Sequence, residues 1–331
     1  MQRQFAIPVV AGLVCLCVLG IPARQSSAGT PRHASGAKTA LARPQVAQTS
    51  PVAQEPGQSQ PPSQAELELR AKELVANQHA DDKALEQYEF VERQIDRTGG
   101  ATPEVLQDKT FRVVPTGSGT LKILLKSDGK AAAADDYRRQ LRDWERVLEL
   151  ALNPNDPRAQ TEHAKWAKKQ RDRAALVNAT QTAFIPKWVG REMSDGRDCD
   201  AYSLTPSPKF HPQSMLQEAL THFTAKVWVD HNANQVVHAE AYCNRDISVG
   251  GGILGKLYRG GVFSFDQVPV APGIWLPARY QYDFTGRKFL FMFHVHQVVE
   301  SSHYRRVGPP EQALMDVKSE IAAGKTIYLD P

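Results

Sequence analysis

The chain has 331 residues, of which 41% are hydrophobic and 23% are charged. This is the composition of a globular protein, long enough for one large domain or two modest ones. The formal net charge is only +4 and the basic residues are scattered, so nucleic acid is excluded as the expected partner.

Residues 1–28 have the pattern of a secretory signal peptide. Arg3 precedes an apolar run that is short for a membrane span, and Ser26 to Ala28 supply small residues for cleavage. The pattern predicts a periplasmic or secreted protein; an uncleaved segment that tethers the chain to the inner membrane is the alternative. Residues 29–62 are rich in Pro, Gln, Ala and Ser without hydrophobic period, which predicts a disordered linker.

The folded part is expected to begin at Ser63, which forms a capping-box pattern with Glu66. Helical spacing of apolar residues predicts helices over about 64–82, 135–152 and 157–178. A short helix is expected within 213–221. Residues 307–331 are expected to form a C-terminal helix and tail.

The predicted helix over 157–178 carries a basic face with two interpretations. The face is formed by Lys165, Lys168, Lys169, Arg171 and Arg173. In the first interpretation these side chains contact anionic lipid headgroups; in the second they form an ordinary solvated helix face.

The stretch from Phe223 to Val299 reads as strands joined by turns. Apolar and polar residues alternate through it with a period of two, the pattern of strands with two different faces. Further strands are predicted upstream, including a hairpin of 184–192 and 199–205, and a turn is predicted at 285–287. Because these strands are segregated from the helices and joined by short turns, residues 63–306 predict an α+β domain with an antiparallel sheet.

Cys199 and Cys243 remain once the signal is removed, and an exported chain with two cysteines suggests a disulfide. In a simple meander, however, Cys199 begins one strand and Cys243 ends the strand two places along. The two would then lie at opposite ends of the sheet, farther apart than a disulfide allows. We therefore expect no bond between them.

Two segments carry chemical motifs with more than one interpretation. Gly250 to Lys256 has phosphate-loop spacing, but Leu257 replaces the metal-binding hydroxyl and no strand-loop-helix context surrounds it, so no nucleotide or other cofactor is expected. His294 and His296 share one side of a strand and are a weak alternative as metal ligands; two polar residues at a sheet edge are the favoured interpretation. No nucleophile elbow occurs, so an enzyme is not expected and a hydrolase is the least favoured function.

Several segments together resemble bacterial envelope proteins of the outer-membrane lipoprotein-sorting superfamily. They occur in the expected order and are Tyr88–Arg93, Ser203–Pro206, Lys226–Asp230, Gly251–Leu257 and Gly273–Pro277. The resemblance implies a curled antiparallel half-barrel of about 9–11 strands, with helices packed across its concave face. Known members hold acyl chains or other lipid in that hollow, and they share no catalytic residues.

This resemblance and the apolar strand faces lead to the functional expectation. A concave apolar surface is the default ligand site, so we expect a periplasmic binding or carrier protein for a lipid or a lipoprotein acyl chain. Trp144 and Trp166 are expected to belong to the helical lid. An envelope protein-interaction or stress-sensing module with a filled interior and a protein partner is the alternative. The expected lining residues are Val227, Val229, Val237, Phe263, Phe265, Leu276, Tyr280, Tyr282 and Phe284.

Overall fold

The computed structural model describes residues 60–99, 102–249, 255–289 and 291–324. None of the helices in these ranges is both long and apolar enough to cross a membrane. The helices are α2 (Gln64–Leu85), α3 (Ala134–Ala151), α4 (Pro157–Ala183), α5 (Met215–Leu220) and α6 (Pro310–Ala322). The strands before α5 are β1 (Tyr88–Arg97), β2 (Val105–Pro115), β3 (Thr120–Ser127), β4 (Lys130–Ala131), β5 (Phe184–Ser194) and β6 (Arg197–Pro206). Those after it are β7 (Phe223–Asp230), β8 (Val236–Cys243), β9 (Ile247–Val249), β10 (Gly255–Leu257), β11 (Val262–Ala271), β12 (Ile274–Lys288) and β13 (Phe291–Arg306).

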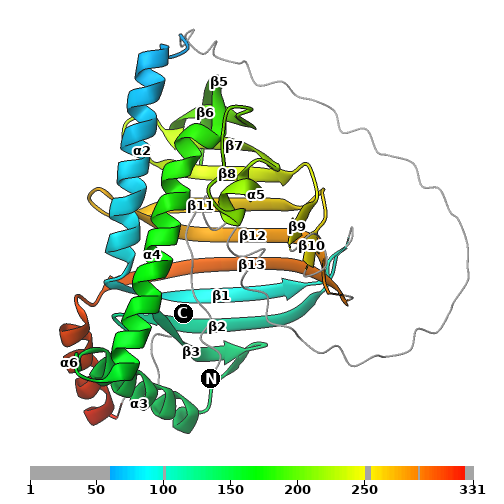
Figure 1. Ribbon diagram of the computed structural model, residues 1–331. Helices are drawn as coiled ribbons and strands as arrows, with labels where there is room; N and C mark the ends of the chain where they lie inside the picture. Colours follow the sequence, from blue (N-terminus) through cyan, green and yellow to red (C-terminus); the bar gives the residue numbers. More distant parts are fainter. Residues whose placement is uncertain (1–59, 100–101, 250–254, 290, 325–331) are drawn as a thin grey trace, which may run out of the picture.

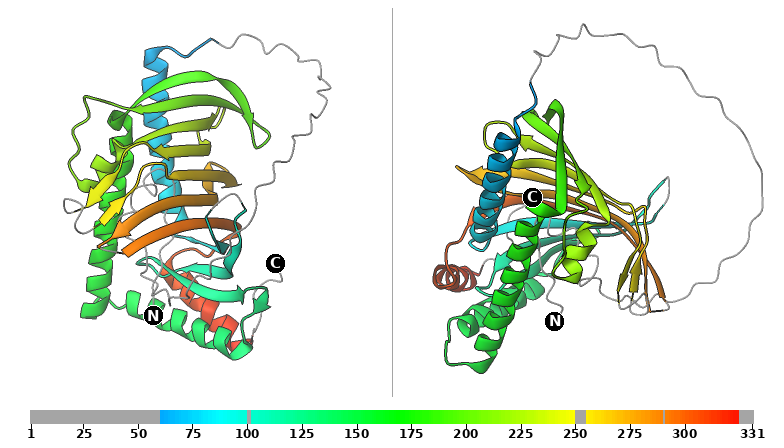
Figure 2. Two further views of the ribbon diagram at one scale, coloured as in Figure 1. Left: turned by 90° about the vertical axis from the view of Figure 1, so that its right-hand side faces the viewer. Right: turned by 45° about the horizontal axis from the view of Figure 1, so that its top comes forward.

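All these strands form one antiparallel sheet (Figure 1). Its order is β4-β3-β2-β1-β13-β12-β11-β8-β7-β6-β5, and β9 and β10 extend it beside β12. The two ends of this order do not pair with each other, so the sheet curls without closing (Figure 2). The predicted α+β half-barrel is therefore confirmed; the strand number exceeds the expected 9–11 because β4, β9 and β10 are only two or three residues long.

One face of the sheet, here called the inner face, is covered by α2, α4 and α5. The largest apolar cluster joins strand residues such as Phe223, Phe263 and Tyr280 to Val75 of α2, Leu176 of α4 and Leu220 of α5. Figure 1 shows α2 and α4 crossing the strands near one end of the sheet. The capping box of α2 forms as predicted: the backbone N–H of Ser63 donates to Glu66 (2.7 Å), and that of Glu66 donates to Ser63 Oγ (3.3 Å).

The helix α3 packs on the opposite, outer face, which corrects the expectation that it belongs to the lid. Val299 of the inner cluster pairs with Gln94, so the alternate residues of β1 and β2 face outward. Val114 is one of these outward residues, and it clusters with apolar residues of α3 and α6. The periodicity of α3 predicts its apolar stripe but does not say which face of the sheet that stripe covers.

The predicted turn at 285–287 is also wrong, because β12 continues to Lys288. Gly286 pairs with Phe293 of β13, and a Cβ on Gly286 would lie 2.3 Å from the Phe293 ring. The glycine therefore permits close approach of an aromatic ring within a strand rather than a reversal of the chain. The chain reverses at Phe289, whose φ is +53°.

A buried ion-pair network ties α6 to the outer face. The guanidinium of Arg112 on β2 contacts Glu89 of β1 (2.8 Å) and Glu320 of α6 (2.9 Å). Tyr137 of α3 donates to Glu320 (3.1 Å), and Arg305 of β13 contacts Glu89 (2.6 Å). The strands β1, β2 and β13 and the helices α3 and α6 thus meet in one network, in which Glu89, Arg112 and Glu320 have little access to water.

Removing one member of this network should be strongly destabilising, because it leaves a buried charge incompletely compensated. We expect Glu320→Ala to lower the free energy of unfolding by about 3 kcal/mol in urea denaturation. The control Glu311→Ala, at an exposed position of the same helix, should cost less than about 0.5 kcal/mol. Equal costs for the two variants would contradict a stabilising role for the network.

Candidate functional site

The inner face of β7, β11 and β12 is a continuous apolar surface. Seven of the nine expected lining residues lie in its cluster: Val227, Val229, Phe263, Phe265, Tyr280, Tyr282 and Phe284. Their rings contact one another across β11 and β12, with centroids 5.0 Å apart for Phe265 and Tyr280 and 5.3 Å apart for Phe263 and Tyr282. The strand alternation therefore brings most of the predicted residues to one place.

Val237 does not lie with this group. The register shifts between Trp228, which pairs with His238, and Val229, which pairs with Val236. This bulge reverses the alternation, and Val237 packs on the outer face with Cys199 and Trp275. Leu276 is fully buried near a second register shift of β12.

Trp144 and Trp166, the two tryptophans expected in the lid, lie in different environments. Trp144 is fully buried in the outer cluster, where its indole N–H donates to the Pro115 carbonyl (2.9 Å). Because the outer cluster does not touch the inner apolar surface, Trp144 is not a lid residue. Trp166 lies on α4, partly exposed, with the Lys169 ammonium 5.9 Å from its ring centroid.

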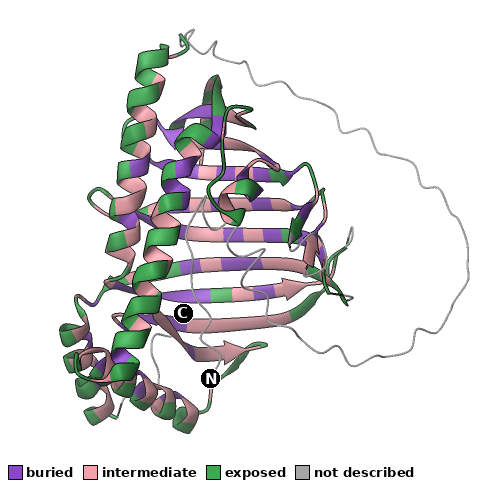
Figure 3. Ribbon diagram, viewed as in Figure 1, coloured by how far each residue is buried: buried purple, intermediate pink, exposed green. Residues whose placement is uncertain are grey.

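Access to the inner face varies along the strands. All nine expected residues are at most 7% exposed, so none is open to solvent in this conformation. Along the inner side of β13, by contrast, Val299 is buried, Val295 and Phe293 are partly buried, and Phe291 is 78% exposed. Figure 3 shows α2 and α4 at the other end of the sheet from β9 and β10, and β10 pairs with the end of β12 that lies beside Phe291 and Phe293. Within the described residues, the inner side of β13 is therefore more exposed toward this end of the sheet, here called the unsealed end, than toward α2 and α4.

The inner face becomes polar toward β1 and β3. Glu92 of β1 is buried, forms an ion pair with Lys122 of β3, and accepts a hydrogen bond from Gln94 (2.6 Å). Gln297 of β13 donates to Asp96 of β1 (2.6 Å). An apolar surface thus lies beside a polar one on the same side of one sheet, an arrangement suited to an amphiphilic molecule. The signal for it was the alternation of Glu92, Gln94 and Asp96 in β1, which sequence reasoning did not use.

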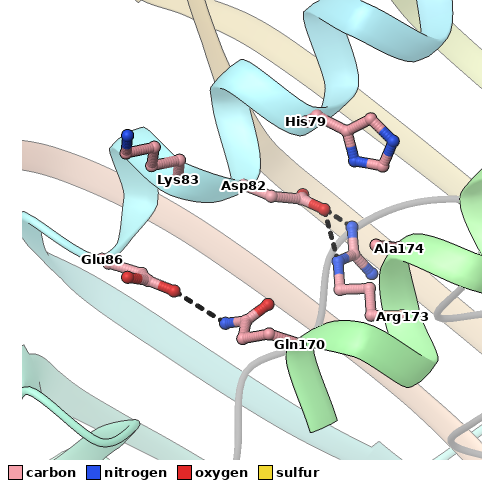
Figure 4. A pocket seen from close by; sticks show the side chains of 7 residues that line it. All are labelled: His79, Asp82, Lys83, Glu86, Gln170, Arg173 and Ala174. Carbon is pink, nitrogen blue, oxygen red and sulfur yellow. Dashed lines mark hydrogen bonds and ion pairs between the residues drawn. The ribbon is translucent and has the colours of Figure 1, made fainter. Parts of the chain in front are cut away.

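A separate cavity of about 180 Å³ lies between α2 and α4 (Figure 4). Arg173 of α4 binds both carboxylate oxygens of Asp82 of α2, at 2.5 and 2.7 Å, and Gln170 donates to Glu86 (2.8 Å). These contacts join the two helices to each other. The cavity is too polar for an acyl chain; its lining is His79, Asp82, Lys83, Glu86, Gln170, Arg173 and Ala174.

A buried carboxyl group anchors α2 to the sheet. Asp81 is 2% exposed, and its Oδ1 accepts a hydrogen bond from the backbone N–H of Trp275 at the start of β12 (2.9 Å). Burial raises the pKa of Asp81 to about 7. Hydrophobic periodicity gave no signal for this contact, because a buried Asp in a helix cannot be told from an exposed one by spacing alone.

Neither a reactive thiol nor a metal site emerges from the expected candidates. Cys199 and Cys243 are free and buried, and burial raises the pKa of each thiol to about 11. The ring of His296 contacts Asp283 (2.8 Å) and that of His294 contacts Thr285 (3.2 Å). Within the described ranges, no three His, Cys, Asp or Glu residues are grouped closely enough to hold a metal ion. The phosphate-loop lookalike falls largely on residues 250–254, outside the described ranges.

Comparison with known proteins gives structural likenesses only. No family model matches the chain, and no curated protein matches its sequence. A lipoprotein-sorting domain from Vibrio parahaemolyticus aligns with 8% identity and a TM-score of 0.30, covering 71% of this chain and 92% of that one. A LolA superfamily protein from Nitrosomonas europaea aligns with 12% identity and a TM-score of 0.29, covering 74% and 96%.

A third likeness is to the MucA/MucB complex of Pseudomonas aeruginosa, with 9% identity, a TM-score of 0.22, and coverage of 73% of this chain and 99% of that one. The first two structures belong to the superfamily that the sequence resembles. With TM-scores below 0.5, none of the three carries an argument about function. The functional inferences below rest on contacts within this chain.

The free energy of unfolding should fall as the pH rises from about 4 to about 7, because the pKa of Asp81 is raised in the folded chain. Its pKa is raised from about 3.8 when unfolded to about 7 when folded, so the folded chain holds the proton more tightly between these values. Unfolding should therefore become easier from pH 4 to pH 7. We expect Asp81→Asn, which keeps the acceptor oxygen without the charge, to be more stable than the parent by ~1 kcal/mol or more at pH 8 and to flatten this dependence.

Urea denaturation at pH 5 and pH 8 measures the effect. Asp195→Asn, at an exposed turn position, is the matched control and should leave the pH dependence unchanged. A parent chain whose stability does not fall between pH 5 and pH 8 would show that Asp81 is not a buried, strained carboxyl.

Proposed function

We propose that the chain is a periplasmic binding or carrier protein for a hydrophobic ligand, a lipid or a lipoprotein acyl chain, held between the curved sheet and its helices. The observation that carries the proposal is the gradient of exposure along the inner side of β13. Buried Val299 is followed on the same side of β13 by Gln297, and then by partly buried Val295 and Phe293 and exposed Phe291. A monomeric domain seldom leaves its core open in this way without a binding role.

The ligand enters at this unsealed end and extends inward beneath α5. Helix α5 has only six residues, and its Leu220 fills space beside Phe223 in the inner cluster. The longer α2 is held by polar contacts, from Arg70 to Asp200 (2.8 Å) and from Trp275 to Asp81 (2.9 Å). Displacing the short helix costs fewer contacts than displacing α2, so α5 is the element that moves.

Burial of the acyl chain supplies the affinity. Each buried methylene contributes ~0.8 kcal/mol, so ten methylenes offer about 8 kcal/mol before the cost of association and of moving α5. The polar groups of β1 and β3 then lie beside the apolar surface, where they can hydrogen-bond a headgroup.

A second function is supported by a different observation, at the β5 edge of the sheet. This strand has 11 residues and exposes Ile185, Val189 and Met193, and β6 is its one partner among the described strands. A long edge strand with apolar side chains is a template for strand addition by another chain. An envelope protein-interaction module without a small ligand would act through this edge.

A charge placed at the unsealed end should distinguish ligand binding at the inner face from protein interaction at the β5 edge. We expect Phe293→Glu to weaken binding of a fluorescent long-chain fatty acid at least tenfold in titration, because the acyl chain would contact a carboxylate. Met193→Glu, on the β5 edge, should leave that affinity unchanged. Thermal melting of both variants checks that each remains folded.

Lipid bound to the wild-type chain on purification, identified by mass spectrometry, is the independent measurement. A chain that carries no lipid and does not bind the fatty acid would overturn the proposal. Loss of fatty-acid binding in Met193→Glu but not in Phe293→Glu would move the site to the sheet edge.

A further inference from the structure

The reversal between β12 and β13 exposes large apolar side chains together with basic ones. The described residues of the hairpin tip are Lys288 at the end of β12, Phe289 in the turn, and Phe291 and Met292 at the start of β13. Phe291 is 78% exposed, Met292 53% and Phe289 52%, and Lys288 is also exposed. Exposed aromatic and aliphatic side chains at a turn have no role in the core of this chain.

The register places basic side chains directly beside these apolar ones. Lys288 pairs with Phe291 in one row, and Arg287 pairs with Met292 in the next. Lys256 of β10 lies across from Arg287 in that second row, held by Asp246 (2.8 Å). The tip thus combines exposed apolar side chains with the exposed Lys288 and the partly buried Arg287, while the charge of Lys256 is offset by Asp246.

The combination of apolar and basic side chains suits the interface between the headgroups and the acyl region of an anionic bilayer. Aromatic and methionine side chains enter the acyl region at shallow depth, while lysine and arginine remain among anionic headgroups. A protein partner would require a broad complementary surface, whereas a projecting tip with apolar groups on both sides suits insertion into a fluid medium. Charge complementarity therefore favours a membrane as the occupant.

We propose that the hairpin tip docks the protein on a membrane surface rich in anionic phospholipid. The inference deepens the proposed function, since the inner side of β13 runs from the tip through Phe293 and Val295 into the apolar cluster. A docked tip would place the unsealed end of the inner face against the bilayer. An amphiphile could then pass between membrane and protein without crossing water.

Co-sedimentation of the full chain with lipid vesicles tests the proposal. The wild-type chain should bind vesicles of phosphatidylglycerol and phosphatidylcholine, bind pure phosphatidylcholine vesicles much less, and lose affinity in 0.5 M salt. The double variant Phe291→Ser, Met292→Ser and the single variant Lys288→Glu should each weaken binding to the anionic vesicles by about tenfold or more. All variants share one N-terminal segment, so any contribution from that segment cancels.

Matched controls carry equivalent changes at exposed positions elsewhere. Met315→Ser on α6 removes a methionine that is 60% exposed, and Lys130→Glu reverses an exposed charge on β4. These two should bind anionic vesicles as the wild type does. Unchanged binding by the tip variants, or an equal loss in tip and control variants, would overturn the proposal.

Fatty-acid titration without vesicles separates this inference from the proposed function. Tip variants that lose vesicle binding but keep affinity for the soluble fluorescent fatty acid support a docking role for the tip alone. If the tip variants keep vesicle binding while Phe293→Glu loses the fatty acid, docking is wrong and the ligand site stands. A wild-type chain that binds the fatty acid but no vesicle also overturns docking, whereas one that binds vesicles but no fatty acid overturns only the ligand proposal.

Discussion

The alternation of side chains along the strands is the constraint on which the structure depends. Each strand residue belongs to one of two faces, and the sheet assigns a different set of helices to each: α2, α4 and α5 to the inner face, α3 and α6 to the outer face of β2 and β3. Because the sheet curls without closing, the inner face collects apolar side chains from β7, β11, β12 and β13 in one cluster. The helices α2 and α4 cross the strands near one end of the sheet (Figure 1), and the inner side of β13 is more exposed toward the other end.

Local sequence patterns predicted the elements well, because each depends on neighbouring residues. Ser63 and Glu66 specified the start of α2, and Asp195 and Gly196, both with positive φ, formed the predicted hairpin turn between β5 and β6. The alternation from Phe223 onward gave the sheet, and the fold class followed from it.

What the sequence did not predict depends on contacts between distant segments. A bulge is one extra residue in one strand, which alternation along that strand does not reveal, so Val237 was assigned to the wrong face. The stripe of α3 is apolar whichever side of the sheet it covers, so Trp144 was assigned to the wrong layer. The burial of Asp81 depends on the contact of α2 with Trp275, which lies far away in the sequence, so no local pattern predicts it.

The inner face has an apolar part and a polar part, and the proposed function uses both. The apolar surface suits a hydrocarbon chain, while the buried pair of Glu92 and Lys122 provides fixed charges of both signs beside it. Polar contacts join α2 to the sheet, whereas α5 has only six residues. Binding of an amphiphile would then require only local movement and no opening of the whole sheet.

The most direct test is nuclear magnetic resonance of valine methyl groups in the presence of a spin-labelled fatty acid. Val295 and Val299 lie on the inner side of β13, and Val298 lies on the other side of the same strand. The account predicts that the methyl signals of Val295 and Val299 broaden, and that those of Val298 and of Val114 in the outer cluster do not. Equal broadening on both sides of β13, or none at Val295, would contradict a ligand site on the inner face.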